Sequence, residues 1–326
     1  MTLAVLRPGL LMTVQDPGRH GHQHVGLCPG GAMDVVSLTI ANALVGNAHD
    51  AAAIEITVLG PDLEFERDTL VALAGADFEA TIPVNRPVLL AAGARLSITR
   101  ALRGARAYLA VAGGIDVAPV LGSRSTYIPG RFGGFEGRVL KRGDRLPLVE
   151  DSAELSRTRF AALKHKRDHS VRWSVPPPTV PDREPIVLHA IEGEHFAYFD
   201  ATMQRTFFDT VWKIGPESNR MGFRLTGASL ERSSAEEILS GPTTLGSVQV
   251  PANGVPIALM ADHQTTGGYP RIAEIASADV PRLAQLGPNG TLHFARCGLD
   301  MAAELRRDLK NRLEPALRAI AWEYGK

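Results

Sequence analysis

The sequence predicts a mainly β protein folded as two domains. Its 32 glycines and 22 prolines separate short apolar runs, and few stretches between them keep a helical period. Many short strands at close spacing favour sandwiches or barrels over a parallel βαβ sheet. The length of 326 residues exceeds that at which single cores stop growing, which favours two domains over one.

Each predicted strand is a short apolar or alternating run bounded by glycine, proline or small polar residues. Such runs occur on both sides of a central segment that has no strand signal. They lie at residues 3–6, 53–57, 63–65, 69–74, 88–90, 95–98, 106–111, 186–190, 206–211, 222–225, 244–248, 255–260 and 291–295.

Two helices are expected. Over residues 34–46, Asp34 is placed to cap the N-terminus and Gly46 to end the last turn. The C-terminal stretch 301–326 predicts an amphipathic helix that bends or restarts at Pro315. Its mixed charges favour packing of the apolar stripe on a neighbouring barrel over membrane binding, and a partner-binding stripe is the open alternative.

The domain boundary is predicted at residues 151–184. This segment loses the strand signal, carries a mixed-charge run at 164–169 and then becomes rich in proline, which favours extended backbone. We therefore expect a β domain at 1–150, a linker at 151–184, a second β domain at 185–300 and the helix after it. A short echo between residues 55–63 and 237–245 is consistent with two copies of one all-β fold.

Charge and cysteine content exclude several classes of function. Lysine plus arginine equals aspartate plus glutamate at 35 each, so no global field attracts nucleic acid or anionic lipid. The two cysteines, Cys28 and Cys297, are too few for a disulfide framework and suit a reducing cytosol. No apolar run reaches about 18 residues. We expect a soluble cytoplasmic protein that binds neither nucleic acid nor membrane.

The principal candidate site directly follows the predicted strand 255–260. Asp262 and His263 are suited to acid–base work, and the polar residues after them to orienting a substrate. Two glycines then allow close approach of the backbone. The alternative is a polar β-turn closed by Asp262. The residues are Asp262, His263 and Gln264 as catalytic candidates, with Thr265, Thr266 and Tyr269 as substrate-binding candidates.

Two more loops carry hydrogen-bond donors suited to carboxylate or phosphate. Residues 121–135 offer Ser123, Arg124 and Tyr127, and residues 216–224 offer Asn219 and Arg220. Each loop is either a solvated surface loop or part of a binding site. We expect Ser123, Arg124 and Tyr127 to face residues 262–266 across one cleft between the domains.

Several chemistries leave no trace in the sequence. No phosphate-binding Gly-x-x-x-x-Gly-Lys loop, dinucleotide fingerprint, biotin-carrying Met-Lys-Met or nucleophile elbow occurs. His20, His22 and His24 alternate, but no carboxylate or thiol follows at ligand spacing, so we expect no metal site. Cys28 has no visible base partner and is interpreted as structural.

Eleven motifs carry a resemblance to a known family along nearly the whole chain. They resemble the family of KipA, allophanate hydrolase subunit 2 and the carboxyltransferase half of urea carboxylase, whose free-standing bacterial members are similar to the C subunit of 5-oxoprolinase. In chain order the motifs are TVQDPGRHGHQHVG, GGAMD, AxxLVGN, AIEITVLGP, LAGAD, YLAVAGGID, LGSRSTY, GGFEGRxLxxGD, SNRMGFRL, GPTTLGSVQVPANG and ADHQTTGGYP.

The resemblance implies two tandem cyclophilin-like β-barrels in a cytosolic protein. It also implies a complex with two partners, a KipI-like protein and a LamB/YcsF-like protein, that opens 5-oxoproline to glutamate at the expense of ATP. ATP is then handled by the complex, and no biotin is attached to this chain. The family has one histidine, matching His24, where this sequence has three, which argues further against a metal.

Three functions compete at this point. The first is a subunit of an ATP-dependent 5-oxoprolinase that is inactive alone. The second is the carboxyltransferase subunit of a split urea carboxylase and allophanate system. The third is a KipA-like regulator that binds a KipI-like kinase inhibitor without chemistry of its own. The lack of a biotin-carrying motif favours the first and third.

Overall fold

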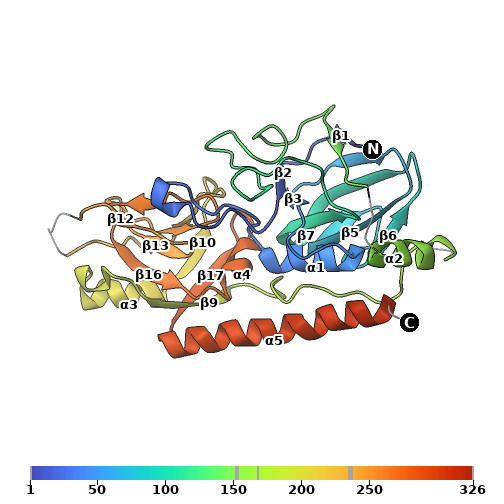
Figure 1. Cartoon of the computed structure of the whole chain (residues 1–326). Coiled ribbons are helices and arrows are strands. Elements are labelled where there is room, and N and C mark those ends of the chain that lie inside the picture. Colours follow the sequence, from blue (N-terminus) through green and yellow to red (C-terminus); the bar gives the residue numbers. More distant parts are fainter. Residues whose placement is uncertain (1, 151–153, 167–168, 234–237, 325–326) are drawn as a thin grey trace. The chain divides into compact units, whose positions relative to one another are not determined.

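The structure is a computed structural model that describes residues 2–150, 154–166, 169–233 and 238–324 (Figure 1). The chain divides into two compact units. Unit 1 comprises residues 1–19, 30–180 and 311–326, and unit 2 comprises residues 20–29 and 181–310. Both are built mainly of β-strands, as the sequence predicts.

Unit 1 contains an eight-stranded sheet that curls around an apolar core (Figure 1). Its longest strand, β7 (Arg95–Val111), pairs antiparallel with three others, so the hydrogen bonds of most of the sheet depend on it. The path runs β2 (Leu11–Gln15), β3 (Ala53–Thr57), β7, β4 (Asp62–Phe65), β1 (Thr2–Arg7) and β8 (Arg145–Pro147), with β5 (Thr69–Ala80) on β7 and β6 (Pro87–Leu90) on β5.

Helix α1 (Val35–Val45) confirms the first predicted helix and both of its predicted ends. The Asp34 carboxylate accepts from the backbone N–H groups of Val36 at 3.1 Å and Ser37 at 3.0 Å. Gly46 ends the helix with φ 83°, a left-handed conformation that favours glycine. Asp34 is fully buried and also accepts from the Thr179 hydroxyl at 2.7 Å, so this cap belongs to the core of unit 1.

Unit 2 is organised around a closed seven-stranded barrel. All neighbouring strands are antiparallel except β9 and β17, which are parallel. Trp212, Phe207 and Phe294 are buried, and the rings of the last two stack with their centroids 4.6 Å apart. The order around the barrel is β10 (Val211–Ile214), β11 (Gly222–Thr226), β14 (Ile257–Leu259), β13 (Ser247–Gln249), β16 (Arg271–Ile275), β9 (Ile186–Glu192) and β17 (Thr291–Arg296).

Short elements connect these strands. A two-stranded ladder pairs β12 (Gly241–Pro242) with β15 (Thr266–Gly267), on either side of β13 and β14 in the chain. The remaining short elements are η1 (Gln23–Val25), η2 (Phe196–Tyr198), α3 (Ala201–Asp209) and α4 (Val280–Ala284).

The predicted strand at 206–211 is wrong, because most of this segment belongs to α3. Asp200 caps that helix, accepting from the backbone N–H groups of Thr202 and Met203 at 2.8 Å each. In this helix Phe207 is buried, while its neighbours Thr206 and Phe208 are half-buried. The true strand β10 begins only at Val211.

The segment 151–184 is not wholly extended, since it contains α2 (Glu154–Lys164). Two side chains of α2 reach the last turn of α1: the Ser156 hydroxyl donates to the Val45 carbonyl at 2.9 Å, and Arg159 donates to the Ala43 carbonyl. These bonds satisfy carbonyls that a helix end leaves open. Residues 151–153 and 167–168 lie outside the described residues, and the predicted domain bounds stay a prediction.

The C-terminal helix α5 (Leu299–Tyr324) is continuous through Pro315 and does not restart there. Ile320, in its last turns, is 1% exposed. Among the described residues, no helix is long and apolar enough to cross a membrane. The predicted echo of residues 55–63 lies at residues 237–245, of which Glu237 falls outside the described residues.

The buried cap of α1 yields a stability prediction. Asp34→Ala should lower the free energy of unfolding by about 2 kcal/mol, because it removes a helix cap and leaves buried donors unsatisfied. The matched control is Asp200→Ala, which removes the exposed cap of α3 and should cost about 1 kcal/mol or less. Urea denaturation of both variants measures the difference. Equal effects would contradict a core role for Asp34.

Candidate functional site

The predicted site loop of unit 2, residues 262–270, is held by backbone hydrogen bonds at several points. The Asp262 N–H donates to the Arg220 carbonyl at 2.8 Å, and the Thr243 N–H donates to the Thr265 carbonyl at 2.9 Å. Further along, Gly267 pairs with Gly241 in the β12–β15 ladder. The loop is therefore fixed to two other segments and is more than a simple turn.

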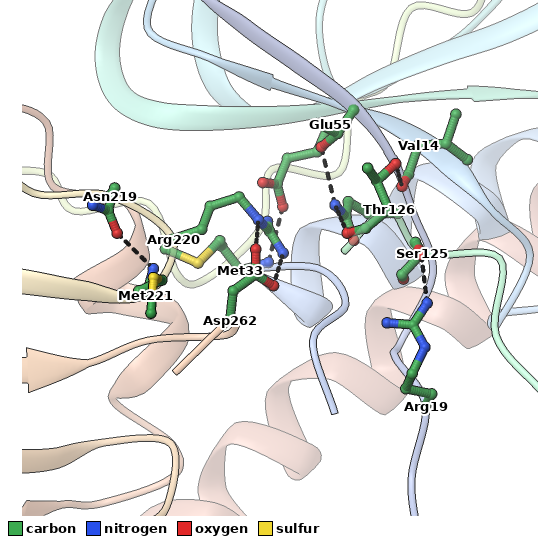
Figure 2. Close-up of polar contacts among 12 residues, drawn as sticks. Val14, Arg19, Met33, Glu55, Ser125, Thr126, Asn219, Arg220, Met221 and Asp262 are labelled. Carbon is green, nitrogen blue, oxygen red and sulfur yellow. Dashed lines mark hydrogen bonds and ion pairs between the residues drawn. The ribbon is translucent and has the colours of Figure 1, made fainter. Parts of the chain in front are cut away.

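Asp262 forms a buried two-point ion pair with Arg220 (Figure 2). The Arg220 Nε donates to Oδ2 at 2.9 Å and its Nη2 donates to Oδ1 at 3.0 Å. Only 4% of the arginine side chain and 2% of the aspartate side chain are exposed. Both carboxylate oxygens are thus engaged, which favours a positioning role for Asp262, and its predicted role as a general base stays a prediction.

His263 is buried beside this pair, with 2% exposure. Burial lowers the pKa of its imidazole, and this is partly opposed by a hydrogen bond to the Gln264 carbonyl and by the charge of Asp262. Its Nδ1 lies 2.7 Å from that carbonyl oxygen, so Nδ1 carries the proton. The ring is neutral at physiological pH, and Nε2 keeps its lone pair.

The Gln264 side chain contacts a second glutamine. Its Nε2 donates to Oε1 of Gln249 at 3.1 Å. Gln249 is 1% exposed, and its own Nε2 has no hydrogen-bond partner among the described residues. A Cβ at position 267 would lie 2.7 Å from this Nε2, so Gly267 leaves that side of the amide without a side chain. Within the part of unit 2 that the structure describes, this amide N–H thus has no acceptor.

A pocket of about 210 Å³ in unit 2 brings several of these groups together. We call it the amide pocket, because three of its lining residues carry side-chain amides. Asn219 at its wall is exposed and accepts from the Met221 N–H at 2.8 Å (Figure 2). The polar lining residues are Glu217, Asn219, Arg224, Gln249, Gln264 and Tyr269.

Of the residues predicted in unit 2, Asn219, Gln264 and Tyr269 line the amide pocket. Asp262, His263 and Arg220 do not line it and are buried in the loops that carry it. Thr265 and Thr266 also lie outside the pocket lining. The Thr265 carbonyl accepts from the Thr243 N–H, next to the β12–β15 ladder.

The predicted residues of unit 1 belong to a loop folded around one carboxylate. Ser123 is 1% exposed, and its hydroxyl donates to Oδ1 of Asp16 at 2.6 Å. The Arg124 N–H donates to the other oxygen, while its side-chain Nε donates to the Val117 carbonyl at 3.1 Å. The Tyr127 ring packs against Phe132 at 5.3 Å. Ser123 therefore shapes the loop.

More bonds fix the same loop in unit 1. Arg19 donates to the Ser125 carbonyl at 2.5 Å, and the Thr126 hydroxyl donates to the Val14 carbonyl at 3.0 Å (Figure 2). The substrate-binding role of Ser123, Arg124 and Tyr127, and their convergence on residues 262–266, stay predictions.

Gln249 is the pocket residue that the sequence reasoning missed. A signal was present: Thr13-Val14-Gln15 is followed by a proline at 17, and Ser247-Val248-Gln249 by a proline at 251. Each glutamine ends a strand, is fully or almost fully buried, and has one amide atom without a partner among the described residues. A polar residue at an inward position of a barrel strand calls for a polar contact.

The histidine cluster has no ligand geometry. His20 and His24 are exposed, and His22 precedes the short helix η1. No group of three or more potential ligands gathers in the described part of the chain. Cys28 is fully buried.

The family described as carboxyltransferase domain, subdomain A and B, matches residues 25–296, and the chain belongs to that family. It is 42% identical to the C subunit of 5-oxoprolinase from Escherichia coli over 98% of both chains. It is 36% identical to the protein of the same name from Haemophilus influenzae, covering 90% of this chain and 91% of that one.

A solved structure shows the same fold. The urea amidolyase of K. lactis superposes with a TM-score of 0.83 at 29% identity, covering 97% of this chain. The present chain spans only 20% of that protein. The fold therefore occurs both as a free-standing protein and as one part of a larger enzyme.

The buried ion pair predicts a large stability effect. Asp262→Asn should lower the free energy of unfolding by about 3–5 kcal/mol, because it leaves the Arg220 charge buried without its counter-ion. The control is Glu217→Gln, which breaks an exposed pair with Arg224 at 3.3 Å and should cost about 1 kcal/mol or less. Chemical denaturation measures both. A stable Asp262→Asn protein whose complex loses turnover would instead support the general-base role.

His263 predicts a pH dependence. Because its pKa is lower in the folded chain than the unfolded value of about 6.5, its contribution to stability is full above that pH. The contribution is lost as the pH falls toward the folded-state pKa. His263→Gln should flatten this decline in melting temperature without abolishing it, since burial also lowers the pKa of His195. The exposed control His24→Gln should leave the profile unchanged, and an equal effect of both variants would refute the assignment.

Proposed function

We propose that this chain is the C subunit of an ATP-dependent 5-oxoprolinase. The reaction is 5-oxo-L-proline plus ATP and water to L-glutamate, ADP and phosphate. The observation that carries the proposal is 42% identity over 98% of both chains to a protein with that name. The match covers nearly the full length of a relative of similar size, which supports this function more strongly than a match to one part of a large enzyme does.

The proposal includes partners and a location. The chain acts with a KipI-like protein and a LamB/YcsF-like protein in the cytoplasm, because the relatives are named as one subunit of an enzyme. The sequence has no phosphate-binding loop of the familiar kinds, so ATP is assigned to the complex. Both units are proposed to be cyclophilin-like, which the closed barrel of unit 2 supports.

We also propose roles in this reaction for the predicted residues of unit 2. His263, neutral and with a lone pair on Nε2, stays a proposed acid–base group of this site, and because it is buried outside the lining of the amide pocket, this role requires the loop to open. Asp262, held by Arg220, positions the loop that carries it. Gln264 and Tyr269, with Asn219, line the wall of the substrate pocket.

A second candidate is the carboxyltransferase of a urea carboxylase. The fold of urea amidolyase covers 97% of this chain, which favours it. The lower identity of 29% and the missing biotin-carrying motif place it behind the first. Both candidates act on a small molecule that contains an amide or urea group.

The reconstituted complex tests the proposal. The purified chain alone should release no ADP with 5-oxoproline, and its mixture with the KipI-like and LamB/YcsF-like proteins should release ADP and glutamate in equal amounts. Urea with bicarbonate, offered to the same mixture with a biotinylated carrier, should be inert. Turnover by the chain alone would show that no partner is needed, and turnover of urea in place of 5-oxoproline would favour the second candidate.

A further inference from the structure

We propose that the amide pocket of unit 2 binds the amide group of a small lactam acid, with Gln249 donating a hydrogen bond to its carbonyl oxygen. The identity of the ligand rests on the proposed function. The location of the pocket rests on the structure alone.

The first argument is the unpartnered donor. Gln249 is 1% exposed, and its Nε2 finds no acceptor among the described residues. A buried N–H group without a partner is unfavourable, and such groups are rare in folded proteins. Gln249 lines the amide pocket, and a small local shift that brings its Nε2 to the pocket surface would let a ligand carbonyl supply the missing acceptor.

The second argument is that the donor is fixed in place. Gln264 donates to Oε1 of Gln249 at 3.1 Å, which sets which end of that amide is left without a partner. Gly267 adds no side chain on that side, since a Cβ there would lie 2.7 Å from Nε2. A donor held by its neighbours loses little conformational entropy when a ligand binds.

The third argument concerns the charge at the pocket wall. Arg224 lines the pocket, and its side chain is 45% exposed in a loose pair with Glu217 at 3.3 Å. An exposed pair of this kind is weak, so a ligand carboxylate can compete for the guanidinium. A pocket lined by both the Gln249 amide and the Arg224 guanidinium suits a ligand that has both an amide carbonyl and a carboxylate.

The size of the pocket narrows the ligand further. Its volume of about 210 Å³ is below the range of about 300–1,000 Å³ that is usual for drug-sized ligands. A single small ring with one carboxylate suits such a space. Nucleotides and peptides do not.

The test measures ligand binding to the full-length chain by saturation-transfer NMR. We expect binding of 5-oxoproline, weaker binding of 2-pyrrolidinone, which lacks the carboxylate, and no binding of proline, which lacks the ring carbonyl. Urea, which offers a carbonyl without ring or carboxylate, distinguishes the second candidate function. Equal binding of proline and 5-oxoproline would overturn the proposal.

Three variants locate the site. Gln249→Leu should weaken 5-oxoproline binding by about 3- to 10-fold, the loss expected for one hydrogen bond. Gly267→Ala adds a methyl group against the same amide, removes no contact, and should weaken binding without unfolding the chain. Arg224→Gln should weaken binding of 5-oxoproline while leaving that of 2-pyrrolidinone unchanged.

The matched control is Gln204→Leu. This glutamine of α3 lies in unit 2 outside the amide pocket, and its Nε2 donates to the carbonyls of Phe196 at 3.2 Å and Phe199 at 2.8 Å. It should not change binding. Equal affinity of the wild-type, Gln249→Leu and Gly267→Ala chains would place the ligand elsewhere and overturn the proposal.

The reconstituted complex separates this inference from the proposed function. If the complex hydrolyses 5-oxoproline and Gln249→Leu leaves its KM unchanged, the pocket assignment falls and the function stands. If the chain binds the lactam in a Gln249-dependent way but the complex does not hydrolyse it, the function falls and the pocket stands.

Discussion

The candidate site of unit 2 depends on the buried ion pair between Asp262 and Arg220. Each residue belongs to a different loop, and the pocket residues Asn219 and Gln264 lie close to them in the chain. An isolated buried charge is very unfavourable, so each loop is held in the one position where its charge is paired. The pair thereby fixes the spacing between the two walls of the pocket. Its value to the protein is geometric, because a well-packed apolar pair would give similar stability without setting the register of two loops so sharply.

Unit 1 uses the same device of a buried carboxylate that fastens loops. The Asp16 carboxylate accepts hydrogen bonds from the Ser123 hydroxyl and from the Arg124 backbone N–H. Glu55 accepts from the Tyr108 hydroxyl at 2.7 Å and from the Met33 N–H at 2.9 Å. Burial and the two nearby carboxylates of Glu55 and Asp34 hold the pKa of Tyr108 well above its ordinary value, so it stays a hydrogen-bond donor. In both units, irregular backbone is stabilised by charges that accept several donors at once, which is how short strands joined by long loops reach a single structure.

The sequence predicted the features that depend on local chemistry. Asp34 and Gly46 marked both ends of α1 because caps act within one turn. Residues 262–266 were singled out because polar side chains follow an apolar strand, and their roles stay predictions. It failed where distant contacts decide. Helix α3 looked like a strand because one face of its apolar run is covered by the barrel, and α2 looked like a linker because its bonds go to α1. The hydrogen bond from Ser123 to Asp16 joins positions more than a hundred residues apart and could not be seen in the sequence, and the substrate-binding role of Ser123 stays a prediction.

The surroundings of the two glutamines explain why the Gln249 side-chain N–H lacks an acceptor among the described residues while that of Gln15 has two. In unit 1, the Gln15 Nε2 donates to the Thr13 hydroxyl at 3.0 Å and to the Thr126 carbonyl at 3.2 Å. The corresponding position in unit 2 is Ser247, whose hydroxyl instead donates to Glu274 at 2.8 Å. Burial raises the pKa of Glu274, and the hydrogen bonds from Ser247 and Thr244 oppose that rise. Because the Ser247 hydroxyl bonds to this carboxylate, it does not accept from the Gln249 amide. Glu274 on β16 thus takes up the hydroxyl at the position that matches Thr13, and Gln249, unlike Gln15, keeps an amide N–H without an acceptor among the described residues. A similar sequence in the two units thus leaves two glutamines with different hydrogen-bond environments, and the proposed ligand recognition rests on that of Gln249.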